Sequence, residues 1–234
     1  MKTLSTKWVL LAVGAALAAI VALGACGDDD DDGVSDEAVQ AAVTQGEMDH
    51  QMMVDQTAVA DFHDGMRKLW EDHVTWTRLA IISIVDDLPD MQTTVDRLLQ
   101  NQVDIGDAIK PFYGDEGGTQ LTELLREHIL IAADILTAAK SNDQVAAGEA
   151  SDRWYANADE IAVFLATANP EEWPQDEMTS MMHEHLDLTL EEATARLTGD
   201  YAADVAAYDK IHNQILEMAD MLSDGIVAQF PDRF

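Results

Sequence analysis

The chain has 234 residues, and its 45 Asp and Glu residues against 13 Lys and Arg residues give a formal net charge of −32. Such a charge repels nucleic acid and anionic lipid headgroups, so neither is expected as a partner. The single cysteine excludes an internal disulfide. The length that remains after removal of a leader suits one domain with a substantial core.

Residues 1–25 have the features of a lipoprotein signal peptide. Lys2 and Lys7 precede an apolar run from Trp8 to Leu23. Residues 23–26 read Leu-Gly-Ala-Cys, the form of a bacterial lipobox, and Cys26 is therefore the expected lipidation site. We expect an extracytoplasmic protein whose partner is the cell membrane, held through lipid at Cys26. A transmembrane anchor is the alternative, but the run is short for a bilayer span.

The next two stretches differ in composition. Residues 26–34 contain five consecutive aspartates and predict a solvated acidic tether. Residues 35–64 are only loosely periodic and predict a helical or partly disordered linker. In this linker Met48, His50, Met52 and Met53 form a group whose thioethers and imidazole suit copper. Methionines that fill gaps against a neighbouring helix are the competing interpretation.

Residues 65–234 show the three-four apolar spacing of amphipathic helices and no alternating stretch of strand type. The pattern predicts an all-α domain, a bundle of about six helices. Helix breakers separate the expected helices at 87–90, 111–118, 141–142, 169–174 and Gly199, with Thr119 as the expected N-cap of the third helix.

Two sets of residues recur with nearly one period. His73, His128 and His185 each lie on the apolar stripe of an odd-numbered helix, at spacings of 128 − 73 = 55 and 185 − 128 = 57 residues. On the even-numbered helices Asn101, Asn157 and Asn213 recur every 56 residues. The repeat predicts three helical hairpins in one bundle. A four-helix core with additional helices is the alternative.

The three histidines are a candidate metal site. In an up-and-down bundle the odd-numbered helices run in the same direction, so the three imidazoles can lie at one height and bind zinc or copper. The expected supporting residues around the metal ligands are Thr77, Thr189, Asn101, Asn157 and Asn213. The competing interpretation is that the histidines are core residues with hydrogen-bond partners and no metal.

The motif Leu69-Trp70-x-x-His73-x-x-Trp76-Thr77-Arg78 resembles a family of small, all-helical bacterial proteins of unassigned function. Further similar motifs begin at Trp154 and Asp220, and the resemblance covers about residues 66–234. It implies a helical fold and supplies no activity, cofactor or catalytic residue. The tether and the methionine-rich segment lie outside it.

Catalytic signatures are missing from the sequence. No His-Glu-x-x-His motif, phosphate-binding glycine loop or nucleophile elbow occurs, and Glu47-x-x-His50 is the one Glu-x-x-His pair, outside the repeats. An enzyme is therefore the less expected class. We expect binding of a transition metal through the repeated histidines, and the alternative is a non-catalytic interaction or scaffold protein of the cell envelope with structural histidines.

Overall fold

The computed structural model describes residues 36–234, excluding the side chains at 36–39, 49–51 and 53–55. The signal segment, Cys26 and the aspartate tether lie outside the described residues. The chain divides into two units, residues 1–50 and 51–234. Among the described helices, none combines the length and apolar character that a membrane crossing requires.

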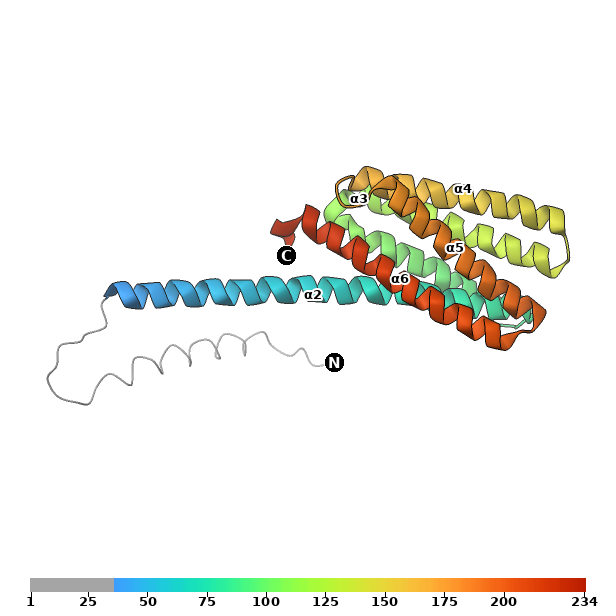
Figure 1. Ribbon diagram of the computed structural model, residues 1–234, viewed down its shortest axis with the longest axis horizontal. Coiled ribbons are helices and arrows are strands. Elements are labelled where there is room, and N and C mark those ends of the chain that lie inside the picture. The colour runs from blue at the N-terminus through green and yellow to red at the C-terminus, as the bar shows by residue number, and fades with distance from the viewer. Residues whose placement is uncertain (1–35) are drawn as a thin grey trace. The chain divides into compact units, whose positions relative to one another are not determined.

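The described part is all-helical, which confirms the predicted fold class. Five continuous helical segments are followed by one 3-10 turn, and the second segment contains two helices joined at a kink, so the bundle has six helices packed as adjacent antiparallel pairs (Figure 1). The elements are α2 (Asp36–Val85), α3 (Met91–Lys140), α4 (Gln144–Ala168), α5 (Gln175–Thr198), α6 (Tyr201–Gln229) and η1 (Pro231–Arg233).

The break inside α3 is much shorter than predicted. The sequence predicts a helix end at Pro111 and a turn as far as residue 118, but Gly114 alone leaves helical geometry, with φ 77° and ψ 173°. This conformation is open to glycine because it lacks a Cβ atom. Thr119 is consequently not an N-cap, since the second half of α3 is already helical before it.

Close backbone contact explains two other glycines of this hairpin. A Cβ atom on Gly106 would lie 2.5 Å from the carbonyl oxygen of Gly118, and one on Gly118 would lie 2.5 Å from that of Gly106. The two halves of α3 therefore approach each other as closely as their backbones allow. Arg126 Nη1 also donates to the Leu99 carbonyl at 3.2 Å, which joins the two halves further along.

The remaining helix ends follow the sequence signals. Asp143 and Asp200 are N-caps of α4 and α6, and each side chain accepts a hydrogen bond from the backbone amide three residues later. Gly199 ends α5 in the left-handed conformation with φ 76°. Because these connections are short, α3 packs on α4, α4 on α5, and α5 on α6.

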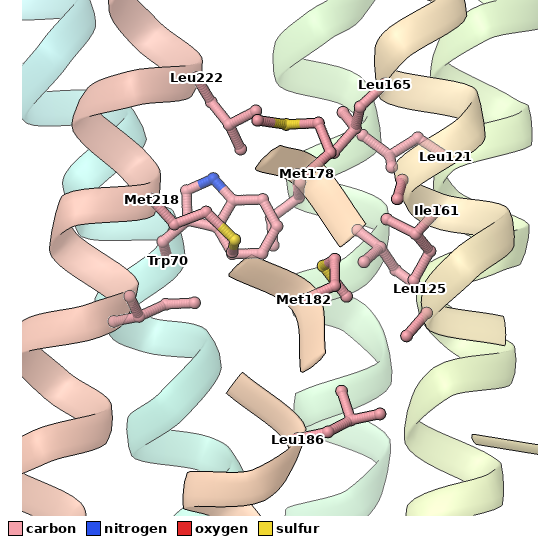
Figure 2. Close-up of a cluster of buried hydrophobic side chains, with 14 of the residues drawn as sticks. Trp70, Leu121, Leu125, Ile161, Leu165, Met178, Met182, Leu186, Met218 and Leu222 are labelled. Atoms are coloured by element: carbon pink, nitrogen blue, oxygen red, sulfur yellow. The ribbon is translucent and has the colours of Figure 1, made fainter. Parts of the chain in front are cut away.

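Core packing begins near Met66, about two turns of α2 before His73. The predicted boundary between linker and bundle, residues 64 and 65, falls inside α2 and close to this point. In the other unit, residues 40–48 of the same helix are all exposed. Figure 2 shows the main apolar cluster, where side chains from α2, α3, α4, α5 and α6 meet: Trp70, Leu121, Leu125, Ile161, Leu165, Met178, Met182, Leu186, Met218 and Leu222.

Candidate functional site

The structure brings the three repeated histidines together in the interior. His73 of α2, His128 of α3 and His185 of α5 are each 3% exposed. The ring centre of His185 lies 5.7 Å from that of His73 and 6.3 Å from that of His128. His185 is therefore the central ring, in contact distance of both others. We refer to these three residues as the histidine layer.

An asparagine fixes the protonation of His128. His128 Nδ1 lies 3.0 Å from Asn157 Oδ1, and Asn157 Nδ2 donates to the Leu124 carbonyl at 3.2 Å. A backbone carbonyl only accepts hydrogen bonds, so the Asn157 amide group must face it and the amide oxygen must face the ring. His128 Nδ1 therefore carries the proton, and Nε2 keeps its lone pair.

The same arrangement recurs around His185. His185 Nδ1 lies 3.2 Å from Gln214 Oε1, and Gln214 Nε2 donates to the Met181 carbonyl at 3.1 Å. The Met181 carbonyl accepts from the amide NH2 of Gln214, so the amide oxygen faces the ring and His185 is also protonated at Nδ1. In both cases the amide side chain bonds to the histidine ring and to a backbone carbonyl of the other helix, and so joins the two helices of one hairpin.

In the first repeat two amide residues share this role: Asn101 bonds to the backbone carbonyl, and Gln102 lies beside the histidine ring. Asn101 Nδ2 donates to the Leu69 carbonyl at 3.0 Å, and Gln102 Nε2 donates to Asn101 Oδ1 at 3.1 Å. Gln102 acts on His73 as a side-chain hydrogen-bond partner, yet His73 Nδ1 and Gln102 Oε1 do not reach full hydrogen-bond geometry. The contact is a looser version of the other two.

The amide partners share one spacing with their histidines: 102 − 73, 157 − 128 and 214 − 185 all equal 29. Aligning the repeats on their asparagines predicts Asn157 and Asn213 as neighbours of the histidine layer. Asn157 does contact a ring, but in the third repeat the contact is made by Gln214. Asn213 is exposed, and the buried Gln214 contacts the ring. A search at constant spacing for any amide side chain would have found Gln102 and Gln214.

Thr77 and Thr189 lie one turn after His73 and His185, as the sequence indicates. Each hydroxyl donates at 2.8 Å to the carbonyl oxygen of the histidine four residues earlier. The hydroxyls therefore satisfy backbone groups and make no hydrogen bond to an imidazole.

Burial keeps the histidine layer neutral. It lowers the pKa of His128 to about 3 and that of His185 to about 4, and the hydrogen bonds that the rings donate to Asn157 and Gln214 only partly oppose this. The pKa of His73 is also lowered well below its usual value, by burial and then by the other two rings. Within residues 36–234, no side chain or backbone group hydrogen-bonds to Nε2 of these rings.

The rings do not form a finished coordination sphere. In the described part of the chain, no three His, Cys, Asp or Glu side chains are placed to hold a metal ion. Three further histidines each pair with one carboxylate: His63 with Asp224 at 3.3 Å, His183 with Asp159 at 2.8 Å and His212 with Glu71 at 2.9 Å. Met48, in the unit of residues 1–50, is 51% exposed.

A buried ionic cluster is centred on Arg78 of α2, five residues after His73. Arg78 contacts Glu192 of α5 and Asp204 of α6, the latter at 2.6 Å, and both carboxylates are almost fully buried. Burial raises the pKa of Glu192 to about 7 although Arg78 opposes the shift. The cluster joins three helices through one guanidinium, and the sequence motif ending in Arg78 gives no sign of its partners.

No protein-family model matches the sequence, and comparisons with curated proteins and with solved structures found no significant match. The resemblance to a family of small helical bacterial proteins therefore stays a prediction, and the chain is characterised by its all-helical bundle.

Proposed function

We propose that this protein binds one transition metal ion, zinc or copper, through Nε2 of His73, His128 and His185. The observation that carries the proposal is the state of the rings: three neighbouring, buried, neutral imidazoles, of which His128 and His185 have Nδ1 on an amide oxygen and so keep their lone pair on Nε2. In addition, His73 Nδ1 is buried without a hydrogen-bond partner among the described residues, and such an atom calls for a water molecule or an ion.

The supporting groups match those of known metal-binding histidines. In such histidines the N–H of the second ring nitrogen donates a hydrogen bond to a carboxylate, carbonyl or water, which fixes the tautomer and the ring orientation. Asn157 and Gln214 supply an oxygen for this purpose, and each is itself held by a backbone carbonyl. Low pKa values also leave the ligands deprotonated, so protons compete little with the metal at neutral pH.

Binding requires a small closure of the layer. With Zn–N distances of about 2.0–2.1 Å and tetrahedral angles, two coordinated imidazole centres lie roughly 5 Å apart. The observed separations from His185 are 5.7 Å to His73 and 6.3 Å to His128. These two ring pairs thus need to approach by about 1 Å, and His73 and His128, which are not in ring contact with each other, must also move together around the ion.

The setting that we propose is the outer face of the cell membrane, with the bundle held by lipid at Cys26. The lipobox at residues 23–26 and the aspartates that follow support it. Replacement of Cys26 by serine is expected to move the protein from the membrane fraction to the soluble fraction. Equal membrane retention of both forms would remove the lipid anchor from the account.

A structural role for the histidines is the second candidate. It is favoured by the amide chains, because His128 with Asn157 and His185 with Gln214 each tie one hairpin together without a metal. On this view the protein is a non-catalytic scaffold of the cell envelope, and the layer selects the packing of three hairpins.

Titration of zinc and of copper(I) into the metal-free protein distinguishes the two. The first proposal predicts one ion per chain, lost in the variant His185→Gln. The matched control is His183→Gln, a half-buried ring on the same helix that lies outside the histidine layer, and this variant keeps the ion. Circular dichroism verifies that both variants fold. No bound ion, or equal loss in both variants, would contradict metal binding and favour the scaffold.

A further inference from the structure

A separate apolar cavity lies one helical turn from the histidine layer. Its volume is about 40 Å³, and Thr77, Ala132 and Thr189, the residues four positions after the three histidines, are part of its wall. Helices α2, α3, α4 and α5 all contribute to the lining, and each lining residue is buried or half-buried.

The cavity explains how the minor core is divided. One small cluster contains Ile81, Ile84, Leu136 and Ala193, and another contains Ala80, Leu98 and Ile129. All seven residues line the cavity, and both clusters pack against the half-buried Val95, which lines it too. Alanines occupy several wall positions where larger side chains would close the space, so side-chain atoms on opposite walls forfeit dispersion contacts.

The lining has almost no polar surface. The two threonine hydroxyls of the wall donate to backbone carbonyls, so neither is left to hold a guest. One water molecule needs roughly 10–15 Å³ and two to four polar partners. The space meets the first requirement and fails the second, and apolar cavities of this kind stay dry and take up nonpolar guests.

We propose that this cavity is a binding site for a small nonpolar molecule of one to three heavy atoms, with xenon and dioxygen as its experimental probes. Such a molecule restores the missing dispersion contacts and needs no hydrogen bond. Trp154 contacts both regions: its indole lines the cavity, and its ring centre lies 5.0 Å from that of His128. The cavity site does not depend on metal binding by the histidine layer.

Methyl NMR of the purified protein under xenon pressure tests the proposal. We expect saturable shifts at the methyl groups of Ile81, Ile84 and Ile129, which line the cavity, and none at Ile211 or Ile215 in the main core. Dissolved dioxygen, which is paramagnetic, should relax the same three methyl sets several-fold faster than those of the main core. Uniform relaxation together with linear, unsaturable xenon shifts would overturn the proposal.

Variants separate cavity binding from general penetration of gas. Ala193→Val fills the cavity and should abolish the saturable shifts, whereas Ala219→Val, at a fully buried position of the main core, should keep them. Ile135→Val enlarges the cavity and should raise xenon affinity several-fold, which provides the test if Ala193→Val does not fold. Unchanged saturable binding in folded Ala193→Val, or no gain in Ile135→Val, would refute the site.

Discussion

Replacing His128 by glutamine should remove a specific part of the protein's sensitivity to acid. Burial lowers the pKa of His128 to about 3, whereas an unfolded chain has a histidine pKa near 6.5. The unfolded state therefore binds the proton first as the pH falls. The stability contributed by the neutral ring is fully present above about pH 6.5 and is lost progressively towards pH 3.

The magnitude follows from the pKa difference. A pH of 5 lies about 1.5 units below the histidine pKa of the unfolded chain, and each unit corresponds to about 1.36 kcal/mol. Protonation of His128 in the unfolded state therefore lowers the free energy of unfolding at pH 5 by about 2 kcal/mol relative to pH 7.5. Glu192, whose pKa is raised to about 7, acts in the opposite direction, because its protonation stabilises the folded state as the pH falls. Its effect cancels when wild type and variant are compared.

The assay is urea unfolding of the metal-free protein at pH 7.5 and pH 5. The difference in unfolding free energy between wild type and His128→Gln should shrink by about 2 kcal/mol between these two pH values. The control Ile161→Val removes one buried methylene and no ionisable group, so its difference from wild type should stay constant. A constant difference for His128→Gln would refute the assignment of a buried, neutral ring.

Three further substitutions test individual contacts by the same unfolding assay. Gln214→Leu should cost about 1–3 kcal/mol because it leaves His185 without its partner, whereas Asn213→Leu at the exposed neighbouring position should stay within about 0.5 kcal/mol; equal effects would contradict the register of the amides. Arg78→Met should cost about 3–5 kcal/mol because it leaves the buried Glu192 carboxylate unpaired and leaves Asp204 with Arg196 alone, at 3.6 Å; a loss below about 1 kcal/mol would show that water reaches the carboxylates. Gly225→Ala should cost about 1–3 kcal/mol, since the new methyl carbon would lie 2.2 Å from a tryptophan nitrogen; a neutral result would show that the indole moves freely.

Much of the fold follows from local sequence signals. The apolar spacing predicts six helices, and the breakers at 87–90, 169–174 and Gly199 mark real helix ends because their chemistry acts locally. The hairpin inside α3 was predicted as a six-residue turn because Gly117 and Gly118 resemble loop residues. Gly118 in fact serves contact with Gly106, twelve residues away, and such a contact is not visible in local composition.

The site was predicted less completely than the fold. Periodicity alone places His73, His128 and His185 at matching positions on the apolar stripes of three helices. The structure brings the three rings together. Their amide partners depend on the register between helices, so alignment by asparagine identity selects Asn213 where Gln214 makes the contact. Ion pairs such as that of Arg78 depend on which of 45 acidic residues lies nearby, and spacing carries no information about that choice.

The most direct test of the proposed metal site is an anomalous difference map from crystals grown with one equivalent of zinc, measured on both sides of the zinc absorption edge. The account predicts one strong peak about 2.0–2.1 Å from Nε2 of His73, His128 and His185, with each Nδ1 still facing its amide oxygen. A peak only at surface histidines, or none within the bundle, would contradict the central claim and leave the histidine layer as a structural element.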